Sequence, residues 1–160
     1  MQRWTGFFGK MPATGDFVAR GLPAGLRLPL DRWLTECLAA VAPEDWPPDG
    51  LRARVTLGGT TALLAAVPSE DRLGRLYPLV AVRRGDDVAL EAANPWCDAV
   101  ICDLADAADG LIGPDDLAQR LDQAPEPQAA ASPQEDAVWR RDGSPAPATR
   151  AGVAALLSSG

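Results

Sequence analysis

Five charged residues stand beside turns and are the strongest candidates for chemistry: Lys10, Asp16, Asp71, Arg72 and Arg75. One interpretation is an anion site, in which the two arginines grip a phosphate or a carboxylate and the lysine adds positive charge. The other is structural, with the two aspartates paired to these cations so that two loops are clamped together. We favour the structural interpretation, because half-buried charges usually have partners and no third catalytic group stands with them. A metal site at the two aspartates would need further oxygen ligands, which the sequence does not place.

The composition excludes several classes of enzyme. The chain has no histidine, which removes Ser-His-Asp and Cys-His machinery and most zinc sites. Three cysteines cannot bind zinc alone, and a helix would hold Cys97 and Cys102 about 140° apart. The chain also lacks phosphate-loop, nucleophile-elbow and dinucleotide-binding motifs. We therefore expect no catalytic residues, no metal, no cofactor and no enzymatic activity.

Apolar runs bounded by turn residues predict the strands that must position these charges. Aromatic residues and glycines in 5–10 indicate one strand, which a turn follows. Segments 55–57 and 61–67 indicate a hairpin with a two-glycine turn, and the second of them reads as buried on both faces. Residues 79–82 indicate another central strand. The candidate charges therefore lie on connections next to central strands.

Helical spacing of apolar residues predicts helices that cover this sheet. One runs from Pro29 to Val41 and is ended by Pro43, and another begins at Pro114 after Gly113. Two carboxylates in the first turn of the second of these helices suit the helix dipole.

The segment between these two helices predicts a strand followed by a helix. A turn at 84–87 allows a short edge strand through Val88 and Leu90. Asn94 then reads as an N-cap and Pro95 as a first-turn proline, so we expect a helix to begin there.

The last third of the chain has weaker patterns. Residues 125–137 are rich in Pro, Ala, Gln and Glu without periodicity, which predicts a linker or a mobile loop. Residues 138–141 indicate a short strand and 152–158 a final helical turn. Together the elements predict one domain over residues 1–160 with an α/β fold, a mixed, largely antiparallel central sheet and helices on its faces.

The aromatic residues are assigned to the core by default. Trp33 lies on the apolar stripe of its helix, and the three phenylalanines are expected inside as well. The other tryptophans stand in loops or at element ends, where each either covers an edge of the domain or anchors a partner: Trp4, Trp46, Trp96 and Trp139.

The net charge of −7 is unevenly distributed along the chain. Residues 1–85 hold eleven Lys or Arg against eight Asp or Glu, whereas residues 86–160 hold four against fourteen. A field this weakly positive releases few counterions from phosphates, so we expect no nucleic-acid partner. The simplest interpretation of the acidic residues in 86–160 is a solvated surface. The more specific interpretation is a surface that binds a basic partner.

The first residues show no signal-peptide pattern, and no run approaches the roughly twenty apolar residues of a membrane span. We therefore expect a cytoplasmic protein that does not insert into a membrane. In that reducing compartment we expect the three cysteines to form no disulfide and to be buried as small apolar side chains.

Two sequence motifs contain the candidate residues, and both resemble motifs of the TagF (ImpM) family of type VI secretion-associated proteins. Residues 6–17 read GFFGKMPATGDF, and residues 70–79 read EDRLGRLYPL. The resemblance continues through 20–23 and 31–34, covers roughly residues 4–83 and weakens beyond residue 84.

The resemblance implies a three-layer α/β/α sandwich and a cytoplasmic, post-translational regulator of type VI secretion system assembly, typically a repressor. It implies action by protein binding, with a forkhead-associated-domain scaffold protein of the system as partner. The five charged residues carry over from the family pattern as a partner-binding or structural site. The alternative from the residues themselves is an enzyme or binding protein for a small phosphorylated ligand held by Lys10, Arg72 and Arg75.

Overall fold

The computed structural model describes residues 3–129 and 135–158, and its elements follow in chain order: β1 (Thr5–Gly9), β2 (Val18–Arg20), α1 (Arg27–Cys37), the short 3-10 helix η1 (Pro43–Asp45), β3 (Leu51–Leu57), β4 (Thr60–Val67), β5 (Leu79–Arg84), α2 (Leu90–Ala108), α3 (Pro114–Asp122), β6 (Ala137–Trp139) and α4 (Arg150–Ser158). Six strands form one sheet in the order β2-β1-β5-β4-β3-β6. Every pairing among the described strands is antiparallel, so their sheet is not mixed as the sequence predicted.

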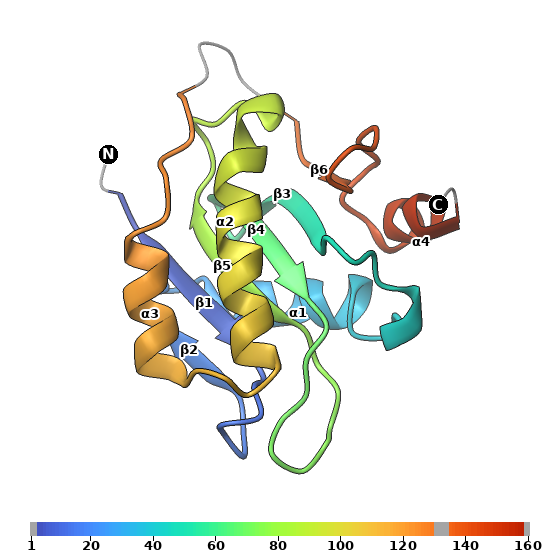
Figure 1. The fold of residues 1–160 in the computed structure, drawn as a ribbon. Coiled ribbons are helices and arrows are strands. Elements are labelled where there is room, and N and C mark those ends of the chain that lie inside the picture. Colours follow the sequence, from blue (N-terminus) through green and yellow to red (C-terminus); the bar gives the residue numbers. More distant parts are fainter. Residues whose placement is uncertain (1–2, 130–134, 159–160) are drawn as a thin grey trace.

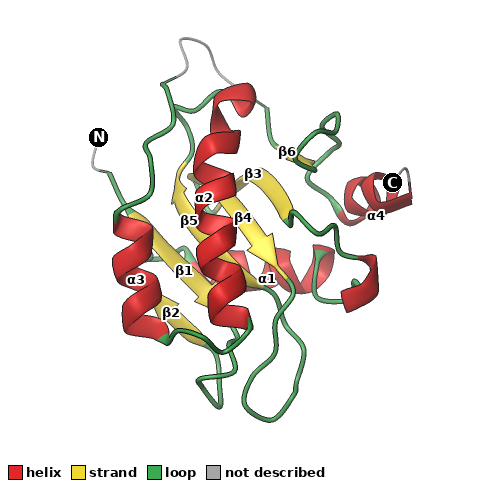
Figure 2. Ribbon diagram, viewed as in Figure 1, coloured by secondary structure: helices red, strands yellow, loops and turns green. Residues whose placement is uncertain are grey.

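The sheet separates two layers of helices (Figures 1 and 2). Alternate side chains of each strand point to opposite faces, so each face has its own core. On one face Leu30 and Leu34 of α1 and Leu156 of α4 pack against the sheet. On the other, Leu104 of α2 and Leu117 of α3 pack against it. The predicted α/β class is confirmed, with the three-layer arrangement that the family resemblance implied.

The central strands follow the sequence pattern closely. The β3–β4 hairpin turns at Gly58 and Gly59, both with positive φ, as the two-glycine turn predicts. The last six residues of β4 are buried, which confirms that this strand is covered on both faces. The three-residue strand β2, which pairs with β1, has no clear apolar pattern and was not predicted.

The start of α2 differs from the prediction. Leu90 belongs to the helix and not to an edge strand, and Pro95 lies inside the helix instead of in its first turn. Val88 is buried and forms only an isolated bridge with Ala129. Because Leu90 and Ala93 pack into the same core as the rest of α2, burial extends the helix backwards past the proline.

The first helix and the end of the chain differ in their bounds. α1 begins before Pro29, at Arg27, and ends at Cys37, so Val41 lies outside it and Pro43 opens η1. Within the predicted loop 125–137, residues 130–134 lie outside the described residues, and Ala137 begins β6. The predicted strand and helix near the C-terminal end are confirmed as β6 and α4.

Most of the large aromatic residues are in the core. Phe7 and Phe8 are almost fully buried, and Trp33 packs where its helical position predicts. Three of the four remaining tryptophans, Trp46, Trp96 and Trp139, are buried as well, whereas Trp4 is only partly buried. Cys37 and Cys97 are buried as expected, but Cys102 is exposed on α2, so that part of the prediction is wrong.

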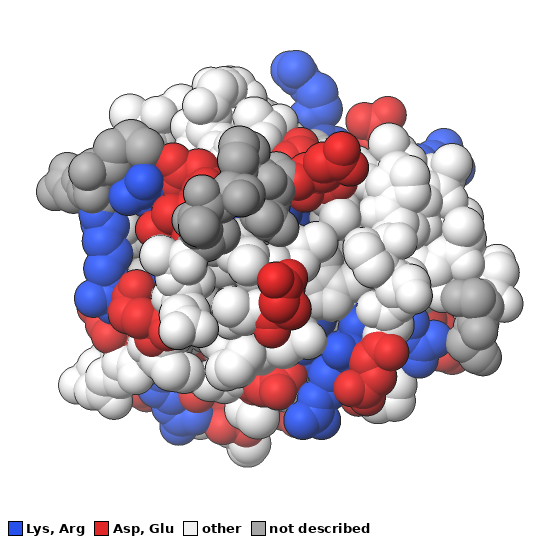
Figure 3. Space-filling view, turned by 90° about the horizontal axis from the view of Figure 1, so that it is seen from above, with Lys and Arg blue, Asp and Glu red and all other residues white. Residues whose placement is uncertain are grey.

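Charges of both signs are interspersed on the face at the top of Figure 1, which Figure 3 shows from above. None of the helices in the described part of the chain is both long enough and apolar enough to cross a membrane.

Candidate functional site

The two motif segments meet at one end of the sheet. The loop between β1 and β2 spans residues 10–17, and the loop between β4 and β5 spans residues 68–78; both extend from the lower end of the sheet in Figure 1. Arg72 donates its backbone N–H to the carbonyl of Thr14 over 2.9 Å, which joins the two loops directly. They join because β1 and β5 are neighbouring antiparallel strands, with Gly9 opposite Leu79.

Gly9 permits this close approach. Its φ is +140°, and a Cβ there would lie 2.1 Å from the carbonyl oxygen of Pro78. No larger residue fits without moving the strands apart. The glycine of the first motif and the proline of the second are therefore in contact across the sheet.

Asp71 organises loop 68–78. Its carboxylate is buried and accepts the backbone N–H groups of Leu73 and Arg75 at 2.9 and 3.0 Å. The same carboxylate accepts Nε of Arg75 at 2.7 Å and lies 3.4 Å from Nζ of Lys10. Gly74 completes the turn with a φ of +79°, which favours glycine. One carboxylate thus fixes both the turn and its tie to loop 10–17.

These contacts determine the pKa of Asp71. Burial alone would raise the pKa, because it disfavours the charged form. The hydrogen bonds from Arg75 and from the backbone of Leu73 act in the opposite direction and outweigh burial, so the pKa falls to about 2. The carboxylate is therefore ionised at neutral pH and serves as a fixed acceptor, not as a proton donor.

Lys10, the only lysine of the chain, is held between two partners. Its side chain is largely buried, pairs with Asp71 and places Nζ 4.9 Å from the centre of the Phe17 ring. A cation over an aromatic face is attracted by the ring electrons. The ammonium group faces groups of the protein, as the structural interpretation requires.

The two arginines also bind groups of the protein itself. Arg72 donates Nη2 to the carbonyl of Ala13, and Arg75 donates Nη2 to the carbonyl of Gly15, both over 2.9 Å. They clamp the neighbouring loop mainly through its backbone, so the predicted clamp is present but uses carbonyl groups together with one aspartate.

Asp16 does not take part in the clamp. Its Oδ1 accepts the N–H of Phe17 over 2.7 Å, and none of the ion pairs among the described residues includes it. The predicted pairing of Asp16 with the cations is therefore wrong, because its carboxylate caps its own turn. Of the five predicted residues, the structure brings together Lys10, Asp71, Arg72 and Arg75.

Tyr77 ties the second motif to α1, a contact that the residue types alone did not predict. Its hydroxyl donates to Oδ1 of Asp31 over 2.6 Å, and burial followed by this hydrogen bond raises its pKa. The ring of Phe17 lies edge-on to Tyr77 and stacked on Phe8, with centroids 4.9 and 5.7 Å away. Phe17 itself remains 36% exposed, so its assignment to the core is wrong.

Loop 68–78 presents apolar side chains to solvent. Residues 72–76 are all exposed, with Leu73 at 73% and Leu76 at 55% of their full accessible surface. Leu73 is placed by its own N–H bond to Asp71, so it projects from a fixed turn. Two exposed leucines held on a braced turn offer an apolar contact to another protein.

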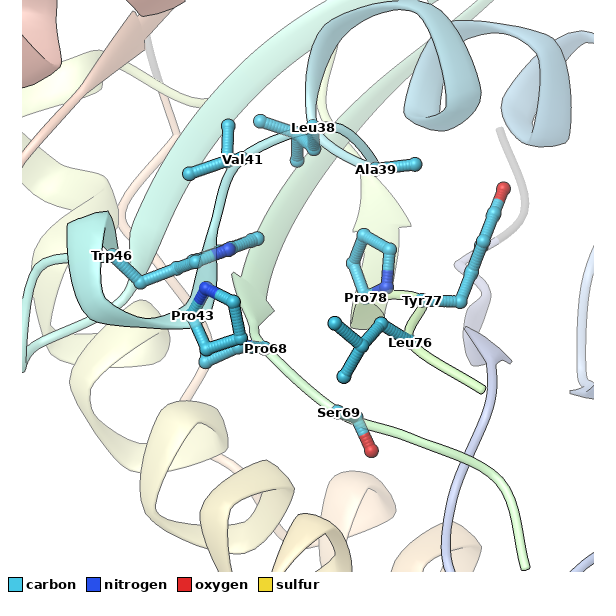
Figure 4. A pocket seen from close by; sticks show the side chains of 10 residues that line it. All are labelled: Leu38, Ala39, Val41, Pro43, Trp46, Pro68, Ser69, Leu76, Tyr77 and Pro78. Carbon is cyan, nitrogen blue, oxygen red and sulfur yellow. The ribbon is translucent and has the colours of Figure 1, made fainter. Parts of the chain in front are cut away.

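A small cavity lies beside this loop, between the segment that follows α1 and the β4–β5 connection (Figure 4). Leu76, Tyr77 and Pro78 line one side, and Leu38, Val41, Pro43 and Trp46 line the other. Its volume of about 10 Å³ holds roughly one water molecule. Ser69 also lines the cavity, and its buried hydroxyl has no hydrogen-bond partner in the protein. A water molecule in the cavity would supply that partner. The cavity is too small for an organic ligand.

Metal ligands do not gather at the motifs. Among the described residues, no group of three or more Cys, Asp or Glu side chains could hold a metal ion. The carboxylates of Asp16 and Asp71 bind different partners. Four nitrogen atoms already contact the carboxylate of Asp71.

Comparison with known families and structures agrees with the motifs. Residues 6–124 match the model of the TagF N-terminal domain, described as type VI secretion system-associated. The crystal structure of PA0076 from Pseudomonas aeruginosa PAO1 is similar at 25% identity and a TM-score of 0.65, over 97% of this chain and 77% of that one. The comparison with curated proteins found no match.

Proposed function

Since this chain belongs to the TagF family of type VI secretion system-associated proteins, we propose that it is a cytoplasmic regulator of that system's assembly, acting after translation as a repressor. On this proposal it works by binding protein, and its partner is the forkhead-associated-domain scaffold protein of the system. The braced loop 68–78, with its exposed leucines, supplies the contact surface.

One observation carries the choice of protein binding over ligand binding. The charged groups of the two motifs point at one another and at backbone carbonyls, while Leu73 and Leu76 point to solvent. The alternative, a site for a small phosphorylated ligand, would need Lys10, Arg72 and Arg75 to converge on open space. Lys10 is instead paired with Asp71, and both arginines are engaged with loop 10–17.

The first test is a Leu73→Asp variant in a pull-down of type VI secretion components from the native bacterium. We expect the wild type to retain the scaffold protein and the variant to lose most of it, because a carboxylate would have to be desolvated in the contact. Leu28→Asp is the matched control, since Leu28 is 74% exposed on α1 and an acidic residue suits a first helical turn.

Melting temperatures decide whether the loss is specific. Both variants replace exposed leucines, so both should melt close to the wild type. Equal retention by Leu73→Asp and Leu28→Asp would remove loop 68–78 from the contact surface. Failure of the wild type to retain any component of the system would refute the proposed function itself.

A further inference from the structure

A second hollow, larger than the cavity beside Leu76, lies between η1 and the end of α2. Its volume is about 280 Å³, at the lower limit of the roughly 300–1,000 Å³ of small-molecule sites. One wall is formed by Pro43, Trp46 and Pro47, and the other by Ile101, Ala105 and Ala108. We call this hollow the proline groove. It shares Pro43, Trp46 and Pro68 with the small cavity beside Leu76, so the two form one apolar surface.

The walls of the groove are rigid and apolar. Proline fixes φ, so the wall at 43–48 has little freedom to collapse into the hollow. Across from it, the small side chains of Ala105 and Ala108 leave the space that larger residues would fill. A preformed apolar hollow of this size accepts one or two side chains of a partner at low entropic cost.

The charge on the two walls of the groove is of one sign. Residues 33–51 and 85–119, which include both walls, contain no Lys or Arg. Glu44 and Asp45 are exposed on η1, and Asp109 lines the groove at the end of α2. None of these three carboxylates is in an ion pair with another described residue. An occupant with positive charge beside its apolar side chain complements this rim, whereas an acidic occupant is repelled.

We propose that the proline groove binds a short basic segment of a protein partner. An apolar side chain of that segment enters the hollow lined by Trp46 and Ala105, and flanking Arg or Lys side chains pair with Glu44, Asp45 and Asp109. The chemistry of the segment follows from the groove. Only its source, a component of the type VI secretion system, rests on the proposed function.

The test uses an array of short overlapping peptides that cover the type VI secretion proteins of the native bacterium. It is probed with the labelled wild type and with an Ala105→Arg variant. The new arginine occupies the groove, adds a positive charge that repels a basic segment, and stands four residues before Asp109 in the last turn of α2, where a cation is favourable. Ala154→Arg, on an exposed position of α4, is the matched control.

We expect the wild type and Ala154→Arg to bind the same peptides, which carry Arg or Lys around an apolar residue. Ala105→Arg should bind them at least about tenfold more weakly. Replacing Arg and Lys of a bound peptide by Glu should abolish its binding to the wild type. Binding should also weaken as salt is raised, because exposed rim charges are screened.

Three outcomes would overturn the inference: no peptide binds the wild type, the bound peptides are not basic, or Ala105→Arg binds them as tightly as Ala154→Arg. A parallel pull-down with full-length secretion proteins separates the two proposals. If Ala105→Arg retains these proteins as the wild type does and binds the same peptides, the groove is not the site and the proposed function stands. If the wild type retains none, the proposed function fails whatever the array shows.

Discussion

At the scale of single residues, Asp71 has the largest role in the candidate site. It accepts two backbone N–H groups and two cationic side chains, so its charge fixes both the shape of loop 68–78 and the position of Lys10. The charged motif residues therefore hold Leu73 and Leu76 in place on the surface that we propose as the partner contact.

The lowered pKa of Asp71 predicts a specific dependence of stability on pH. Its ordinary value is 3.8 and its value in the folded protein is about 2. As the pH falls between these values, the unfolded chain binds the proton before the folded chain does, so acid favours unfolding. The contribution of Asp71 is fully present above pH about 4 and is lost as the pH approaches 2.

Urea titrations between neutral pH and pH about 2.5 test this, with Asp71→Asn as the variant. The variant should be less stable than the wild type at neutral pH, and the difference should narrow as the pH falls below 4. A difference that stays constant across this range would show that the carboxylate's charge does not stabilise the loop.

At the scale of elements, a buried polar network fixes α2 against β3 and β6. Arg52 is 1% exposed and donates to Oδ1 of Asn94 and to Oδ1 of Asp98, at 2.7 and 2.8 Å. Nε1 of Trp139 donates to the same oxygen of Asn94 at 3.1 Å, and Asn94 donates to the carbonyl of Arg141 at 3.2 Å. One amide thus joins a helix to two strands.

Asn94→Ala should lower the free energy of unfolding by about 2 kcal/mol, since it leaves buried donors of Arg52 and Trp139 without acceptors. Chemical denaturation measures the loss. Gln119→Ala removes an exposed amide from α3 and should change stability by less than about 0.5 kcal/mol. Similar losses for the two variants would mean that the network contributes little.

The sequence predicted the central strands and the positions of the motif loops because burial pattern and turn chemistry agree there. The helix α2 shows the limit of such local rules. Pro95 marked the expected start, but the fit of Leu90 and Ala93 to the sheet decided the actual one. Contacts that join distant segments, such as Tyr77 with Asp31, leave no periodic signal and needed the structure.

Four of the five residues predicted for the candidate site come together, and their contacts were predicted only in part. Lys10 and Asp71 pair as the structural interpretation expected, whereas Asp16 binds its own backbone. The exposure of Phe17 also escaped prediction, since an aromatic residue in a motif reads as core. Residue type indicates which partners a side chain accepts, but the path of the loop decides which of them it reaches.

At the scale of the whole molecule, the sheet divides the interior into two apolar layers that share several of its strands. Leu30 of α1 is fully buried in one layer, and Leu104 of α2 is fully buried in the other. Because β1, β4 and β5 line both layers, loss of packing in one layer removes support from the other.

Leu30→Ala and Leu104→Ala should each cost about 2–5 kcal/mol and should each shift one common unfolding transition. Circular dichroism and tryptophan fluorescence, followed together in denaturant, measure it. Leu28→Ala, an exposed change in α1, should leave the transition within about 0.5 kcal/mol of the wild type. Separate transitions for the two probes would show that the layers unfold independently.

The placement of Lys10 has a practical consequence for mapping any complex of this protein. Amine-reactive cross-linkers need an accessible lysine, but the only one here is 9% exposed and already paired with Asp71. Such reagents will leave the folded chain nearly unlabelled except at its α-amino group, and a negative result with them carries no information about contact. Linkers that activate carboxylates find 22 Asp and Glu residues instead, and they would report directly on the acidic rim of the proline groove.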